Sequence, residues 1–117
     1  MAGITTHVLD TNRGRPAAGV RIDLSVLDGS DWKFVKTITT NVDGRTDGPV
    51  VRPEEAKAGD YELVFYIDEY FGKQPDSSGL QPFVDRAVVR FSIFDVKQHY
   101  HVPLLCTPAS CTTYRGS

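Results

Sequence analysis

The stretch RIDLSVLDGSDWKFVKTIT, residues 21–39, decides the fold class. On both sides of its centre apolar residues alternate with polar ones, as Ile22 and Leu24 do, and this period of two is typical of a strand with one buried face. The Asp28-Gly29 pair at the centre favours a tight hairpin turn, because glycine adopts the backbone angles that such turns need. The stretch therefore predicts two antiparallel strands joined by a hairpin.

The same alternation, cut by short turn signals, recurs along the rest of the chain. Together with the opening pair, the runs expected as strands cover residues 4–10, 20–28, 32–40, 61–68, 86–95 and 100–106. Short pieces at 44–46 and 111–115 bring the expected number to about eight, which is what a two-sheet sandwich uses. Only 52–59 and 68–74 leave room for a helical turn, the second as a short connector. The sequence predicts an all-β, two-sheet antiparallel β-sandwich with one short connector helix.

Composition limits the classes of partner. The chain has 117 residues with 13 Lys and Arg against 15 Asp and Glu, so we expect a single domain over 1–117 without a basic field for nucleic acid or a membrane surface. No apolar run approaches the roughly 20 residues that a membrane-spanning helix needs, and no export signal opens the sequence. Two cysteines without a metal spacing favour a soluble protein in a reducing, cytoplasmic compartment.

The cysteines themselves, Cys106 and Cys111, allow more than one interpretation. The alternation places Cys106 on the apolar face of its strand, which favours a small packing residue. A hairpin disulfide or a redox switch remains open.

Three histidines stand on predicted strands. His7 lies in the middle of the first run, and His99 and His101 flank Tyr100. Because side chains alternate along a strand, His99 and His101 share one face and Tyr100 points to the other. Solvated or core-satisfied side chains, a metal pair and catalytic bases are all compatible with this pattern. A zinc site would need further ligands, and no cysteine or carboxylate is obviously spaced to supply them.

Arg45 follows an Asp-Gly turn and would stand at the start of a strand. On local evidence it is either a solvated surface residue or a group that reaches across a neighbouring face. The sequence has no nucleophile elbow and no phosphate-binding glycine loop. If the protein is an enzyme, direct attack by water, with a histidine as base and an arginine as electrostatic support, is the chemistry that these residues favour.

Four segments carry a resemblance over nearly the whole chain. They are TTHVLDTNRGRPAAGV at 5–20, DGRT at 43–46, HYHVPLL at 99–105 and YRGS at 114–117. Together they resemble the 5-hydroxyisourate hydrolases, a transthyretin-like family of urate breakdown. The resemblance implies a transthyretin-like sandwich that hydrolyses 5-hydroxyisourate to 2-oxo-4-hydroxy-4-carboxy-5-ureidoimidazoline without a metal or organic cofactor. It also implies a homotetramer, a dimer of dimers with active sites at the dimer–dimer interface.

The resemblance assigns site residues as well. The implied catalytic set is His7, Arg45, His101 and Ser117, and the implied substrate-binding set is His99, Tyr114, Arg115 and Gly116. His101, with His7, would deprotonate the water, Arg45 would stabilise negative charge, and the YRGS tail would tuck into the interface. Which histidine is the principal base is left open. Two alternatives also stand: a transthyretin-like carrier of a small ligand, and a related hydrolase acting on another lactam ring.

Overall fold

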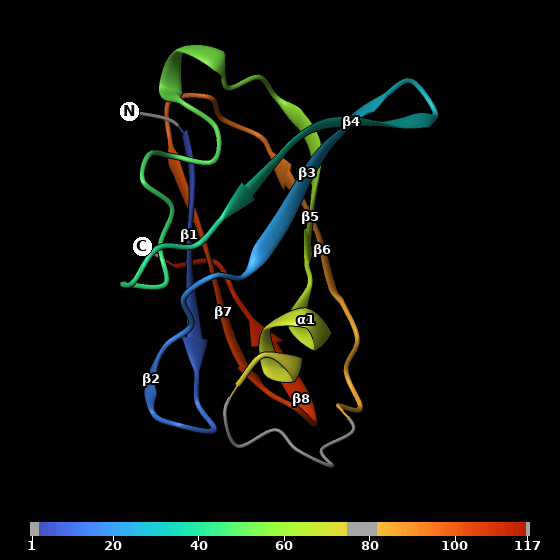
Figure 1. Ribbon diagram of the computed structural model, residues 1–117. Coiled ribbons are helices and arrows are strands. Elements are labelled where there is room, and N and C mark those ends of the chain that lie inside the picture. The colour runs from blue at the N-terminus through green and yellow to red at the C-terminus, as the bar shows by residue number, and fades with distance from the viewer. Residues whose placement is uncertain (1–2, 75–81, 117) are drawn as a thin grey trace.

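Two four-stranded sheets face each other across the core (Figure 1). The computed structural model describes residues 3–74 and 82–116. Its strands are β1 (Gly3–Asp10), β2 (Arg15–Pro16), β3 (Arg21–Asp28), β4 (Asp31–Thr39), β5 (Gly59–Phe65), β6 (Ala87–Ile93), β7 (His99–Thr107) and β8 (Ser110–Thr113). A 3-10 helix, η1 (Pro53–Glu55), and one α-helix, α1 (Ile67–Gly72), complete the described elements. The first sheet has the order β2-β1-β7-β8 and the second β4-β3-β5-β6.

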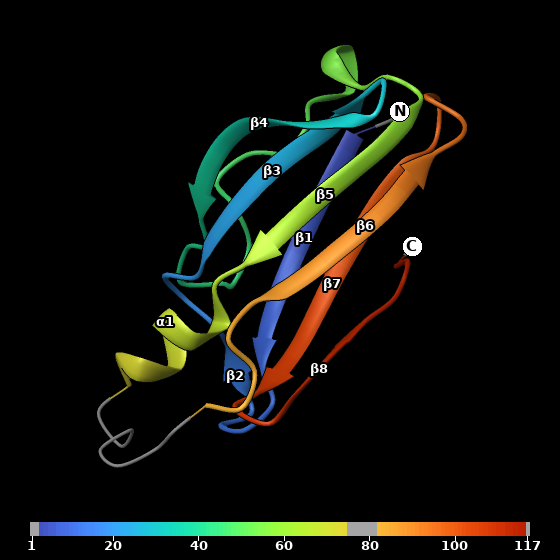
Figure 2. The ribbon, with the colours of Figure 1, turned by 90° about the vertical axis from the view of Figure 1, so that its right-hand side faces the viewer.

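The predicted sandwich, its six main strands and the connector helix α1 are confirmed. One neighbouring pair departs from the antiparallel expectation, because β1 and β7 run parallel, with Gly3 opposite His99 and Asp10 opposite Cys106. The turn after β6 brings the chain to the end of the first sheet where β1 begins, so β7 starts beside Gly3 and runs the same way (Figure 2).

The piece at 44–46, expected as a short strand, is also different. Arg45 forms only an isolated bridge to His7, and the additional strand of the first sheet is β2, which pairs with the end of β1. Turn and bend residues on both sides of Arg45 explain this, because they leave no extended run to pair with β1.

The core lies between the inner faces of the two sheets and is closed at one end by α1. The largest fully buried side chains are Phe65, Phe71, Ile4, Ile22, Leu24, Leu63, Ile67, Ile93 and Leu104. Burying one such side chain contributes about 1.5–3 kcal/mol. The alternation seen in the sequence has its physical cause here, since alternate residues of β1, β3 and β5 face this core.

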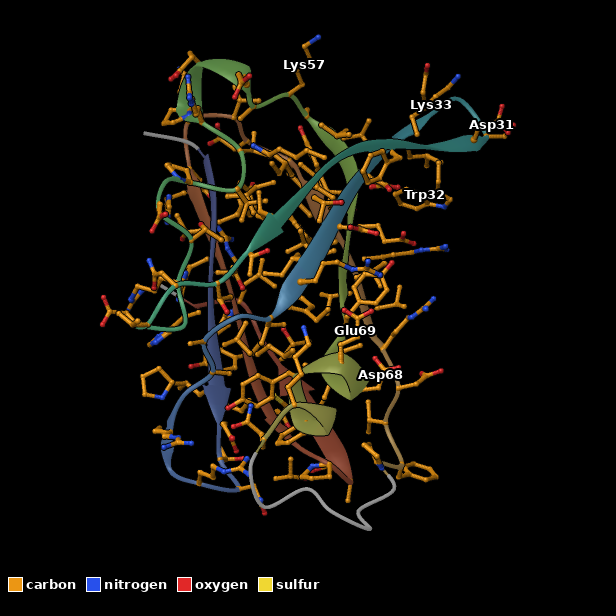
Figure 3. All side chains as sticks on the ribbon, viewed as in Figure 1. Asp31, Trp32, Lys33, Lys57, Asp68 and Glu69 are labelled. Carbon is orange, nitrogen blue, oxygen red and sulfur yellow. The ribbon has the colours of Figure 1, made fainter. Side chains whose placement is uncertain are left out.

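The hairpin predicted from the Asp-Gly pair is present, with Asp28 opposite Asp31. Figure 3 shows Asp31, Trp32 and Lys33 at its outer end. Trp32 lies against the guanidinium of Arg90, whose carbon is 4.5 Å from the ring centroid. The tip is therefore a surface feature and takes no part in the core.

The two cysteines are directly opposite each other on β7 and β8, and both are free thiols. Cys106 is fully buried in the core, as the alternation predicts. A hydrogen bond with Cys111, together with burial, raises the pKa of the Cys106 thiol well above its ordinary value. Cys106 is accordingly a packing residue in this structure and is disfavoured as a nucleophile.

None of the helices in residues 3–74 and 82–116 is long and apolar enough to cross a membrane.

Candidate active site

The outer face of the first sheet gathers polar side chains from two strands. Thr5 and His7 on β1 are partly exposed, and between them Thr6 is buried. On β7, His99 is exposed and His101 is half-buried. The parallel register places Thr5 directly opposite His101. Pairing of two distant strands therefore brings all three histidines to one surface.

Thr5 joins two of these histidines. Its Oγ1 lies 2.8 Å from Nε2 of His99 and 2.8 Å from Nδ1 of His101. A hydroxyl has one proton and two lone pairs, so it can donate to only one of the rings and must accept an N–H from at least one of them. Thr5 could not be singled out from the sequence. Its only local signal is its place two residues before His7, on the same face of the strand.

Arg45 is brought to His7 by a tight loop. The side-chain Oδ1 of Asn41 accepts the backbone N–H of Arg45 at 3.2 Å. Gly44 has φ +75° and passes so close to the carbonyl oxygen of Val8 that any Cβ would collide with it. The Val8 N–H in turn donates to the Gly44 oxygen at 2.7 Å. The Asp-Gly-Arg order thus fixes Arg45 as the bridge partner of His7.

Two of the histidines have lowered pKa values. For both His7 and His101 burial is the largest cause and the positive charge of Arg45 is the second. The charges of His7 and His99 add to the effect on His101, whereas Asp43 opposes the lowering at His7. Both imidazoles are therefore neutral at pH 7 and each keeps a lone pair that can take a proton.

The tail after β8 runs back along β7 (Figure 2). The Gly116 N–H donates to the His101 carbonyl oxygen at 2.8 Å. A Cβ at position 116 would lie 2.6 Å from Cδ2 of His101, so only glycine lets the tail approach the ring this closely. The preceding residue, Arg115, donates to the His99 carbonyl oxygen at 3.3 Å. Its guanidinium carbon also lies 4.3 Å from the centroid of the Tyr100 ring. The tail is therefore bound along the start of β7.

The structure brings together most of the positions that the resemblance assigns. The residues that meet on the outer face are His7, Arg45, His99, His101 and Gly116. Tyr114 is 58% exposed and lines a neighbouring groove with Phe91 and Val102, between β6 and the tail. Ser117 lies outside the described residues.

A larger cavity of about 740 Å³ lies elsewhere, lined by Leu24, Val26 and Tyr61 among others. It contains none of the three histidines. We place the candidate site on the histidine face because perturbed titratable groups gather at reaction sites, and a hollow alone supplies no chemistry. In the part of the chain that is described, no group of three or more His, Cys, Asp or Glu is placed to hold a metal ion.

Known proteins share both the sequence and the fold. A 5-hydroxyisourate hydrolase of Deinococcus radiodurans is 49% identical over 98% of this chain and 96% of its own length. A crystal structure of an (S)-allantoin synthase is 42% identical with a TM-score of 0.86, and the match covers 99% of this chain but 44% of that larger one. Sea bream transthyretin, solved in complex with thyroxine, is 26% identical with a TM-score of 0.85, and the match covers 97% of this chain and 93% of that one. The model of the HIUase/Transthyretin family matches residues 4–116, and the chain therefore belongs to that family.

Proposed function

We propose that this protein hydrolyses 5-hydroxyisourate to 2-oxo-4-hydroxy-4-carboxy-5-ureidoimidazoline. The observation that carries the proposal is the pair of neutral imidazoles, His7 and His101, beside the guanidinium of Arg45 on one sheet face. The high identity to hydrolases of that name supports the choice of substrate. A base and a fixed positive charge at the same place are what water attack on a cyclic amide requires.

The proposed reaction uses these groups in order. His101 takes a proton from a water as the water oxygen attacks the carbonyl carbon C6 of the substrate. Arg45 meets the negative charge that develops on the carbonyl oxygen, because its planar fork of donors fits an oxygen-rich ring edge. The C6–N1 bond then breaks, and N1 takes the proton back from the imidazolium. Water is thereby added across the amide and no other reactant is consumed.

His7 and the tail would complete the pocket. His7, the bridge partner of Arg45, would help to hold the water. Tyr114, Gly116 and Ser117 would form a wall, with Arg115 as the anchor that ties this wall to β7. His99 would border the pocket through its link to Thr5.

The proposal includes a homotetramer, a dimer of dimers. Strands β6 and β8 end the two sheets on the same side of the sandwich and are open to pair with a second copy (Figure 2). Val88, Phe94 and Tyr114 are large, exposed apolar residues near these edges. The histidine face would be closed by the second dimer. We further propose that residues 1–117 act as a single domain and that the protein works in the cytoplasm, where the two free thiols fit a reducing environment.

The sequence left two alternatives, a small-ligand carrier and a hydrolase of another lactam ring. They require different side chains on the histidine face. A carrier of a small apolar ligand would gain nothing from two neutral imidazoles beside a guanidinium. A hydrolase acting on another lactam ring would use the same residues and differs only in substrate.

The test is to generate 5-hydroxyisourate from urate with a urate oxidase and to follow its ultraviolet absorbance with and without this protein. We expect the decay to be much faster with the protein and the product to be the ring-opened acid. A decay that stays at the spontaneous rate would refute the hydrolase. Retention of the intact ring by the protein in equilibrium dialysis would then point to a carrier.

A further inference from the structure

We propose that Thr5 is a positioning residue that fixes the tautomer of His101, so that the lone pair of its imidazole stands at Nε2, the ring nitrogen that Thr5 does not contact. This inference rests on the proposed function, and it adds a residue that neither the sequence motifs nor the resemblance assigned.

The first step is hydrogen-bond direction. Thr5 Oγ1 is within 2.8 Å of a nitrogen on each of two rings, His99 and His101. With a single hydroxyl proton it cannot donate to both, so at least one of the two rings must give Thr5 an N–H. The hydroxyl of Thr5 thereby limits which ring nitrogens can carry a proton.

The ring that gives its N–H to Thr5 can be inferred from the nitrogen that each ring presents. Thr5 contacts Nδ1 of His101, whereas it contacts Nε2 of His99. If His101 gives its Nδ1 proton to Thr5, its Nε2 must carry the lone pair, because a neutral imidazole has only one N–H. Nε2 is next to Cδ2, the ring atom that the tail at Gly116 approaches, so this lone pair is on the side where the proposed pocket closes. The opposite arrangement would protonate Nε2 and leave no base there.

The third step is charge. When His101 accepts a proton at Nε2, its Nδ1–H to Thr5 becomes a charge-assisted hydrogen bond, and such bonds are stronger than neutral ones. Thr5 can support this change because its own proton is then free to be donated to Nε2 of His99, which lies 2.8 Å from Oγ1. The groups that face His101 are His7 and Thr5 on β1, His99 on β7 and Arg45 in the loop before η1. Of these, Thr5 is the one that bonds Nδ1.

The matched variants are Thr5→Val, Thr5→Ser and Thr6→Val. Valine has the shape of threonine without the hydroxyl, and serine keeps the hydroxyl. Thr6 is the neighbouring residue on the inner face, where its hydroxyl donates to the Val102 carbonyl at 2.7 Å. Thr6→Val therefore removes a hydroxyl from the same strand without touching the histidines.

In steady-state kinetics on 5-hydroxyisourate we expect Thr5→Val to lower kcat by about tenfold with little change in KM, which is the rate equivalent of one lost hydrogen bond. Thr5→Ser should restore kcat to within about twofold of the original protein. Thr6→Val should lower the thermal midpoint and leave kcat unchanged below it. A Thr5→Val variant with full kcat, or a Thr5→Ser variant as slow as Thr5→Val, would overturn the inference.

A second readout does not depend on turnover. In long-range ¹H–¹⁵N correlation spectra of the imidazoles at neutral to mildly alkaline pH, we expect His101 to carry its proton at Nδ1 in the original protein and in Thr5→Ser. In Thr5→Val the Nε2–H form should appear. If the ring signals do not change, Thr5 does not set the tautomer. If the original protein fails to hydrolyse 5-hydroxyisourate, the proposed function is wrong, and the spectra still decide the role of Thr5.

Discussion

The two faces of β1 use the same kinds of side chain for opposite purposes. On the inner face, Thr6 donates to a main-chain oxygen, and the buried carboxylate of Asp10 accepts from Arg13 at 3.1 Å and from the Tyr70 hydroxyl at 2.7 Å. On the outer face, the Thr5 hydroxyl is shared between two imidazoles, and His7 keeps a lone pair at neutral pH. The inner polar groups are saturated, whereas the outer ones retain capacity to bind or to accept a proton.

A single strand can thus serve both the stability of the fold and the chemistry of the site. In the described part of the chain no buried side-chain nitrogen or oxygen lacks a hydrogen-bond partner. Saturated buried groups hold the sheet rigid, because an unpaired one would cost free energy of folding. Rigidity of the inner face is what keeps the outer groups in position. Substitutions one residue apart on β1 or β7 should therefore have separable effects.

The largest effect is expected on the outer face, from His101→Asn. Asparagine keeps hydrogen bonding but cannot act as a base near pH 7, and loss of a general base lowers the rate by a factor of about 10²–10⁴. The thermal midpoint should stay close to that of the original protein, as circular dichroism would show. Full turnover in this variant would assign the base to another residue, with His7 the first to test.

Leu104 lies on the inner face, three residues further along β7 than His101. Leu104→Ala should lower the stability of the protein and leave its rate almost unchanged. Leu104 is 1% exposed, and truncating a buried leucine costs about 2–5 kcal/mol in the free energy of unfolding. Denaturant unfolding at one fixed protein concentration measures this loss. The rate per folded molecule should change by less than about twofold. A large loss of rate in fully folded protein would mean that the two faces are coupled.

Gly116→Ala tests a contact across the outer face itself. The added methyl would stand 2.6 Å from the His101 ring, so the tail or the ring must move. Misplacement of catalytic groups by about 1 Å costs up to about 10² in rate, and we expect a loss between 10-fold and that value. The unfolding midpoint should change little, since the tail is outside the core. An unchanged kcat/KM would show that the tail is not part of the site.

The smallest change is expected in the pH profile. Because burial and Arg45 lower the pKa values of His7 and His101, the rate should fall only below pH 6.5, by about tenfold per pH unit once the base is protonated. Removing the positive charge with Arg45→Gln makes protonation easier, so the pKa values rise and the acid limb moves to higher pH.

Arg45→Lys is the control for this shift. It keeps the charge and loses the planar fork, so its rate should drop while its acid limb stays where it was. An acid limb that is the same in all three proteins would mean that Arg45 does not tune the histidines.

The part of the fold that depends on neighbouring residues could be predicted from the sequence. The hairpin from β3 to β4 follows from the Asp28-Gly29 pair, and the shared face of His99 and His101 follows from the alternation of a strand. Both are local properties, so no knowledge of distant pairing is needed.

The pairing of segments that are far apart in the chain could not be predicted from the sequence. The parallel register that sets Thr5 against His101 is decided by how β1 and β7 pack on the core, and no local pattern specifies it. For the same reason the turn before Arg45 was visible in the sequence, but its bridge to His7 was not. The grouping of His7, Arg45 and His101 came from the resemblance, and the structure adds Thr5 to it.

The parallel pairing of β1 with β7 has a consequence for how the molecule is made. It joins positions such as Thr5 and His101, which are 96 residues apart in the chain. Contacts of such high sequence separation slow folding, because a long loop must close before they can form. During synthesis β1 therefore leaves the ribosome early and can pair at once with β2, but β7 becomes available only when almost the entire chain has been made. We therefore expect the second sheet, whose strands are closer in sequence, to assemble first and the surface that carries the histidines to be completed last.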